Sequence, residues 1–113
     1  MNEKDLTRLH HMLDSAKEVR DFTGNQSKAD FKDNRMLALS VTRLIEIIGE
    51  AAANVSKDGR QELPNLPWGT IIGMRNRLIH AYFDINLDIV WETVENDIPP
   101  LILELEKFLA DPG

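Results

Sequence analysis

The chain contains no cysteine, and this absence excludes several classes of protein at once. It can form no disulfide framework, supply no thiolate nucleophile and bind no metal through cysteine. Disulfides belong mainly to secreted proteins, so we expect a cytoplasmic protein. The first residues, MNEKDLTRLHH, are polar and contain no apolar signal core.

Long apolar runs and an excess of positive charge are also missing. No run approaches the roughly 18 apolar residues that a membrane span requires, and the formal net charge is −6. Affinity for nucleic acid comes largely from neutralising phosphates. A nucleic-acid function would therefore need a local basic patch, or one that a second subunit completes. We expect no cofactor and no metal site.

The 113 residues are 42% hydrophobic and 28% charged, which is ordinary for a globular protein with one core. We therefore predict a single domain over residues 1–113. Apolar residues recur every three or four positions, the period of amphipathic helices, and no segment alternates as a strand would. The predicted helices are residues 5–22, 27–56, 67 to about 80 or 82, and 87–109.

Local residue types predict where these helices begin and bend. Ser27 and Asp30 have the spacing of a capping box, and Pro67 suits a first helical position. Either Asp84 or Asn86 can cap the last helix. Pro99-Pro100 predicts a kink near residues 97–98, because proline removes a helical hydrogen bond. The fold class is all-α, an antiparallel four-helix bundle with a proline-kinked last helix.

One stretch, Gly73–Asp84, concentrates cationic, proton-transferring and aromatic side chains. On an ideal helix Arg75 lies near the middle of an apolar arc formed by Trp68, Ile71, Ile72, Leu78, Ile79 and Tyr82. A guanidinium is almost never buried without a partner. Arg75 is therefore expected to meet Glu46 or Glu50, or to reach a polar cavity. The alternative for both glutamates is a solvated helix face.

The opposite side of the same helix is a strip of Gly69, Gly73, Asn76 and His80. Glycine costs about 1 kcal/mol relative to alanine inside a helix, so we expect a partner backbone or a ligand to cover the strip. Arg75 and His80 are about 140° apart on the ideal helix. A long arginine side chain, unwinding after His80, or a second copy of the chain can close that gap. The plainer alternative is that Arg75 and Arg77 are solvated, His80 caps the helix and Tyr82 belongs to the core.

The segment Arg75-Asn76-x3-His80 resembles the HEPN motif, and Tyr82 extends it to the R-x4-H-x-Y form of the HepT toxins. The resemblance covers most of residues 5–109. It includes residues 43–51, Pro67-Trp68 with Gly73-Met74, Val90-Trp91, and Pro99-Pro100. It implies a homodimeric helical bundle that acts as a metal-independent endoribonuclease toxin. In this resemblance Arg75, Asn76 and His80 are catalytic, and Arg77, Glu46 and Glu50 support the site or bind RNA.

The resemblance also implies a partner and a modification. In HepT-like pairs a minimal nucleotidyltransferase (MNT) antitoxin transfers AMP to the motif tyrosine, here Tyr82. Arg75 and Tyr82 are seven residues apart, on one face of a continuous helix, so the added group would block RNA phosphate. The negative net charge also suits docking to a basic antitoxin surface. Two alternatives remain: a non-catalytic helical partner of a nucleotidyltransferase, and a purely structural dimer.

Overall fold

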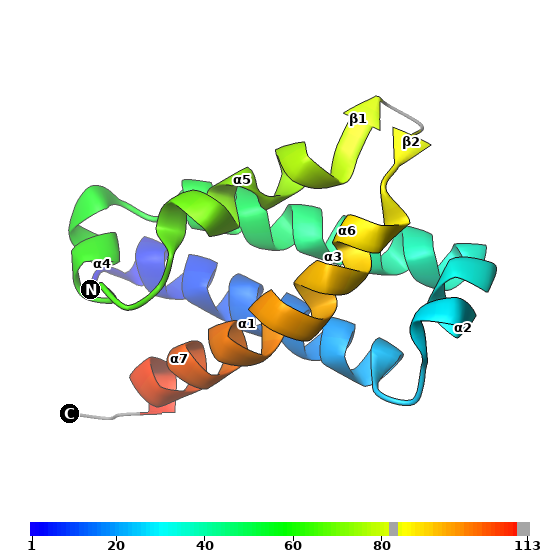
Figure 1. Ribbon diagram of the computed structural model, residues 1–113. Coiled ribbons are helices and arrows are strands. Elements are labelled where there is room, and N and C mark those ends of the chain that lie inside the picture. Colours follow the sequence, from blue (N-terminus) through cyan, green and yellow to red (C-terminus); the bar gives the residue numbers. More distant parts are fainter. Residues whose placement is uncertain (82–83, 111–113) are drawn as a thin grey trace.

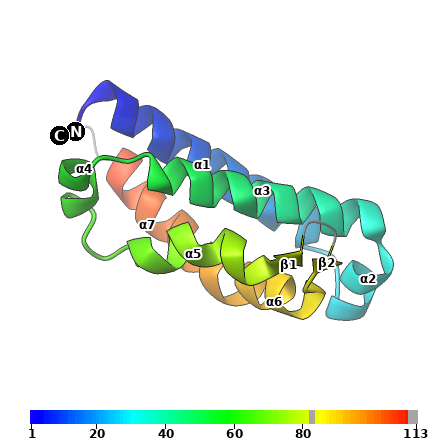
Figure 2. The same ribbon diagram turned by 90° about the horizontal axis from the view of Figure 1, so that it is seen from above.

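Four long helical segments pack as an up-down-up-down bundle (Figure 1). The computed structural model describes residues 1–81 and 84–110, and at residues 75, 78–81 and 84 it describes the backbone alone. Helix α1 lies along α3 and α7, and α3 lies between α1 and α5 (Figures 1 and 2). The elements are α1 (Glu3–Thr23), α2 (Lys28–Asp33), α3 (Arg35–Ala53), α4 (Lys57–Gln61), α5 (Trp68–Leu78), β1 (Ile79–Ala81), β2 (Asp84–Ile85), α6 (Leu87–Glu92), the π-helix η1 (Thr93–Asp97) and α7 (Ile98–Ala110).

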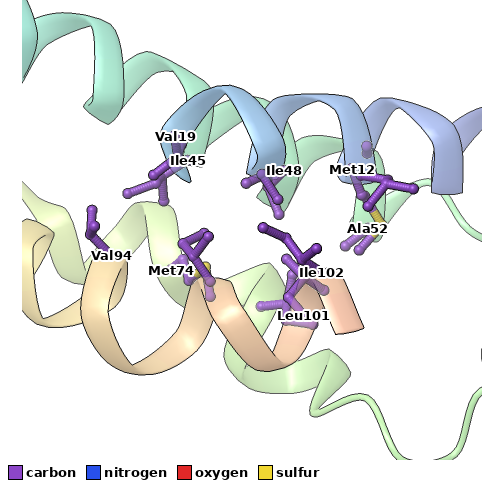
Figure 3. Packing of buried hydrophobic residues seen from close by; sticks show 14 of the residues in the cluster. Met12, Val19, Ile45, Ile48, Ala52, Met74, Val94, Leu101 and Ile102 are labelled. Carbon is purple, nitrogen blue, oxygen red and sulfur yellow. The ribbon is translucent and has the colours of Figure 1, made fainter. Parts of the chain in front are cut away.

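The apolar stripes predicted from the sequence meet in one core, which confirms the all-α fold class. Each long segment contributes fully buried side chains, and Figure 3 shows them interlocking between α1, α3, α5 and α7. Burying such apolar area is the main favourable term in folding, at about 25 cal/mol per Å². The buried residues include Leu9, Met12 and Val19 of α1, Ile45 and Ile48 of α3, Ile71 and Met74 of α5, and Ile98 and Leu105 of α7.

The second predicted helix is two helices, so the prediction of one helix over residues 27–56 was wrong. Its start is confirmed: Ser27 and Asp30 form the capping box, with both hydrogen bonds at 3.1 Å. The chain then leaves helical geometry at Asn34 (φ −111°, ψ 94°). The Asn34 side chain accepts a hydrogen bond from the Leu37 N–H at 3.0 Å and so caps α3. Asparagine favours such caps over helix interiors because its side chain competes for backbone groups.

The predicted irregularity before Pro99-Pro100 is confirmed, and it takes the form of a π-helix. Over η1 the helical turn widens, and the Ile98 N–H donates to the Thr93 carbonyl, five residues back. Proline has no N–H to donate, and its ring would collide with the carbonyl four residues earlier in a regular α-helix. A wider turn relieves that collision, and π-turns of this kind are often found at functional sites. Helix α6, capped as expected by Asn86, thus continues into α7.

Two side-chain clusters hold the ends of α5 and α1. The Arg60 guanidinium donates to the Val55 and Ala53 carbonyls, each at 3.1 Å, at the end of α3, and stacks on the Trp68 ring at the start of α5. Buried Asp5 accepts hydrogen bonds from the Ser56 N–H at 2.9 Å and from the Ser56 hydroxyl at 2.5 Å. These contacts fix α1 and α5 at the α3–α4 corner, and so set the position from which α5 runs.

The Asp5 contact should make the protein sensitive to acid. Hydrogen bonds from the Ser56 hydroxyl, then from its N–H, lower the pKa of the Asp5 carboxyl below its ordinary value of 3.8. The Asp5 carboxyl therefore binds a proton more readily in the unfolded chain than in the folded one. Its contribution to the free energy of unfolding is complete above the ordinary pKa and is lost as the pH falls through the lower, folded pKa. Urea unfolding at pH 7 and at pH values below 4 should show Asp5→Asn losing stability mainly at the higher pH. Asp14→Asn, at an exposed carboxyl of α1, should show the same dependence of stability on pH as the wild type. If Asp5→Asn lost the same stability at every pH, the lowered pKa of Asp5 would not be the cause.

Candidate functional site

Helix α5 carries the first part of the motif, and a close contact with α3 holds this helix in place. An added Cβ at Gly49 of α3 would lie 3.3 Å from the Ile71 carbonyl oxygen and 3.6 Å from that of Ile72. A side chain at position 49 would therefore push α5 away from α3. The small residue at position 49 thus admits α5 at close range, just ahead of the motif.

The sequence predicted that one helix runs through the motif to about residue 80 or 82, and this prediction was wrong. Helix α5 ends at Leu78, and residues 79–81 form strand β1, which pairs antiparallel with β2 (Figure 1). His80 thus lies in a strand, whereas Arg75 lies in a helix. Ile79 is β-branched, a residue type that favours strands. The 140° separation of Arg75 and His80 on one ideal helix therefore no longer applies, and the predicted shared face of Arg75 and Tyr82 involves a residue outside the described ones.

The buried face of α5 is also displaced from the predicted arc. Ile71 and Met74 are each 1% exposed, whereas Trp68 and Ile72 are half-buried. With about 100° per residue, position 75 lies about 70° from the middle of this buried face. The side chain of Arg75 lies outside the described set, so its predicted place near the middle of the apolar arc stays a prediction.

The glycine strip lies on the open side of α5. Side chains built at Gly69 and Gly73 would meet nothing within 4 Å, and Asn76 is exposed. Nothing in the described part of this single chain covers the strip. Asn76 therefore presents its amide to a flat and accessible surface. The expectation that a partner backbone or a ligand covers the strip stays a prediction.

Arg77 lies on the other flank of α5, toward the C-terminal helix. Its Nη2 atom is 3.6 Å from Oδ2 of Asp97 in the π-helix η1, and the Arg77 side chain is 49% exposed. An exposed pair of this kind contributes little to stability. It leaves most of the five guanidinium N–H donors to other acceptors. Arg77 is thus placed at the surface, where a support or RNA-binding role requires it.

Glu46 and Glu50 share one described partner, and it is not in the motif. Nη1 of Arg43 lies 3.2 Å from Oε2 of Glu46 and 3.6 Å from Oε1 of Glu50, all three residues being on α3. The predicted contact of either glutamate with Arg75 falls on a side chain outside the described set. Glu46 is the more buried of the two. The solvated-face alternative therefore fits Glu50 better than Glu46.

The structure thus brings some predicted residues together and leaves others outside the described range. Asn76 and Arg77 are exposed neighbours on α5, and the chain passes directly from Arg75 in α5 to His80 in β1. The side chains of Arg75 and His80, and the whole of Tyr82, lie outside the described residues. Chemically, the segment offers guanidinium groups that suit phosphate and an imidazole that titrates near neutral pH.

Sequence reasoning missed two residues that contact the predicted set. Arg43 was detectable, since its spacing of three residues from Glu46 is a standard helical ion-pair spacing. Asp97 follows Arg77 by twenty residues, and no local pattern links the two. No group of three or more His, Asp or Glu among the residues with described positions could hold a metal ion. Within the same ranges, no helix is long and apolar enough to cross a membrane.

Comparisons with known proteins give a consistent match over nearly the whole chain. The family model described as "Ribonuclease HepT-like" matches residues 12–108. A "Putative RNase" of Methanocaldococcus jannaschii is 38% identical over 107 residues, or 94% of this chain and 98% of that protein. A "Probable ribonuclease HepT" of Thermococcus cleftensis is 35% identical over 99 residues, or 88% of this chain and 90% of that protein. No solved structure gives a significant match.

Proposed function

Because this chain belongs to the HepT-like ribonuclease family, we propose that it is a cytoplasmic, metal-independent endoribonuclease toxin. Its site is completed by a second copy of the chain. The observation that carries the proposal is the position of the motif. Asn76 lies on an open glycine face of α5, and that helix connects Arg75 directly to the strand containing His80.

The chemistry follows from the residue types. The ribose 2′-OH attacks the adjacent phosphate, and the bond from phosphorus to the 5′-oxygen breaks, leaving a 2′,3′-cyclic phosphate and a free 5′-OH. One His80 takes the proton of the attacking hydroxyl, and a second donates a proton to the leaving 5′-oxygen. Arg75 stabilises the extra charge on the phosphorane-like transition state through paired N–H donors. Asn76 orients the phosphate by hydrogen bonding.

A homodimer gives these roles a physical basis. One imidazole cannot easily serve both as base and as acid in a single step, whereas two copies supply two. The uncovered strip at Gly69 and Gly73 suits close approach by another copy, because glycine permits backbone contact at a cost in helix stability. Helix α3 also exposes two large apolar side chains, Met36 at 81% and Leu39 at 43%. Burying these two side chains against a second copy would remove their apolar area from water.

The proposal includes regulation by a minimal nucleotidyltransferase antitoxin that transfers AMP to Tyr82. The net charge of −6 supports a protein that binds RNA only in a small cleft, lined by Arg75, Arg77 and their copies in the partner. The same charge favours docking to a basic antitoxin surface. Glu46 and Glu50 support the site from α3, where Arg43 forms an ion pair with each.

The decisive measurement is cleavage of RNA by the purified chain in excess EDTA. We expect cleavage to persist, the products to end in 2′,3′-cyclic phosphate, and the protein to elute with twice the mass of one chain. A strict need for a divalent metal, or 3′-hydroxyl products, would refute the mechanism. A chain that cuts no RNA but still accepts AMP would instead be the non-catalytic partner of a nucleotidyltransferase.

A further inference from the structure

A cavity between α5 and the C-terminal helix lies beside Arg77 and is not used by the proposed mechanism. Its volume is about 140 Å³, and its walls come from the α4–α5 connection, α5, η1 and α7. Cavities of about 150 Å³ hold one benzene-sized ring. The space therefore accepts a single six-membered ring.

The floor of this cavity is apolar and buried. Leu66, Ile71, Met74 and Leu101 line it, and each is at most 4% exposed. Pro67 and Pro100 add two further rings to the walls. Such a floor suits the face of a flat, uncharged ring, because hydrophobic contact needs no directional partner.

The rim of the cavity is polar, and its charge is negative. It contains Asn65, Thr70 and Asn96 together with the carboxylates of Asp97 and Glu104. Each carboxylate has one described ion pair: Asp97 with Arg77 at 3.6 Å, and Glu104 with Lys107 at 4.0 Å. A carboxylate has about four lone-pair positions, so one loose ion pair leaves each of them able to accept further hydrogen bonds.

These features exclude the simplest alternative ligands. A free phosphate would face two carboxylates and no cation within the lining. A hard divalent cation requires six or more oxygen ligands, and half of these walls are apolar. A flat ring with hydrogen-bond donors on its edge satisfies both the floor and the rim.

We propose that this cavity binds an RNA base, and that it prefers bases with an exocyclic amino group. The ring lies on the Ile71–Met74–Leu101 floor, and the amino group donates to Asp97 or Glu104. At the 4-position uracil carries a carbonyl oxygen where cytosine has its amino group, so at that position it presents an acceptor to the carboxylates. The Arg77 guanidinium, held at the rim by Asp97, then lies where the phosphate of the same nucleotide can reach it.

The inference rests on the proposed function only in taking RNA as the source of the base. It can be tested without cleavage, by titrating ¹⁵N-labelled protein with cytidine and with uridine, which lack phosphate and differ at the 4-position. We expect cytidine to shift the amide resonances of Thr70, Asp97 and Leu101. We expect uridine to bind about tenfold more weakly, the size of one well-placed base contact.

Two variants make the test specific. Thr70→Phe fills the cavity from its exposed rim and should abolish the cytidine shifts. Thr7→Phe places the same ring at an exposed threonine of α1 and should leave them unchanged. Glu104→Gln and Asp97→Asn introduce amide donors, so together they should narrow the difference between cytidine and uridine.

Equal binding of the two nucleosides, shifts located elsewhere, or cytidine binding that survives Thr70→Phe would overturn the inference. The outcome is separable from that of the proposed function. A protein that cleaves RNA in EDTA but takes up no cytidine refutes the base site alone. A protein that binds cytidine here but cuts no RNA supports the base site and refutes the ribonuclease mechanism.

Discussion

Replacing His80 with alanine should lower the rate of RNA cleavage by about 10² to 10⁴, the usual contribution of a positioned general acid or base. Replacing Arg75 with alanine should cost about 10² to 10³, since it removes the donors that stabilise the transition-state charge. Arg75→Lys should recover only part of this loss, because an ammonium keeps the charge but not the paired geometry of a guanidinium. The measurement is the single-turnover rate on a defined RNA in EDTA.

Matched controls separate catalysis from folding. His11 is an exposed histidine of α1, and Arg20 is an exposed arginine of the same helix, paired only to its neighbour Asp21 in the described contacts. His11→Ala and Arg20→Ala should cleave at the wild-type rate. The His80 and Arg75 variants should unfold in urea at nearly the wild-type midpoint. Cleavage that persists in both motif variants would show that another site carries the activity.

Features fixed by neighbouring residues were predictable from the sequence. The capping box of Ser27 and Asp30 and the cap by Asn86 involve groups three residues apart, so residue type and spacing decide them. The irregularity ahead of Pro99-Pro100 follows from the missing N–H of proline. The four apolar stripes recur with the helical period, and this was sufficient for the fold class.

Other local predictions failed where two tendencies compete. The apolar periodicity runs through Asn34 without a break, but the side chain of that residue caps a new helix. The third helix was predicted to run to about residue 80 or 82, but α5 ends at Leu78. The β-branched Ile79 that follows favours a strand. Periodicity alone cannot choose between these outcomes.

Other features could not be predicted because they depend on contacts between residues that are far apart in the sequence. Arg77 pairs with Asp97 only because the π-helix brings that carboxylate beside α5. The cavity next to them is built from two stretches that are distant in the sequence, residues 65–74 and 96–104. The resemblance identified Arg75, Asn76 and His80 from the motif. Their assembly with a second copy stays a prediction, because it depends on surfaces of two chains.

Incubation with an MNT-type nucleotidyltransferase, ATP and Mg²⁺ should add one or more AMP units to the chain and suppress RNA cleavage. The chain has a single tyrosine, so modification of any tyrosine must fall on Tyr82, whose structure lies outside the described residues. Tyr82→Phe removes only the phenolic oxygen. It should therefore prevent the mass shift and keep the RNA cleavage of the unmodified protein.

The suppression follows from charge and bulk. Each AMP joined to the Tyr82 oxygen brings a negatively charged phosphodiester and an adenosine, two residues beyond His80 in the sequence. RNA would then approach a site where the arginines already face a phosphate, and where a protein of net charge −6 has become more negative. Raising the salt concentration screens repulsion beyond about 10 Å at 0.1 M but does not remove a covalent obstacle. If AMP acts at close range, cleavage should stay suppressed in salt and return only when a phosphodiesterase removes the AMP. Full cleavage by the modified wild-type protein would mean that the modification does not control the site.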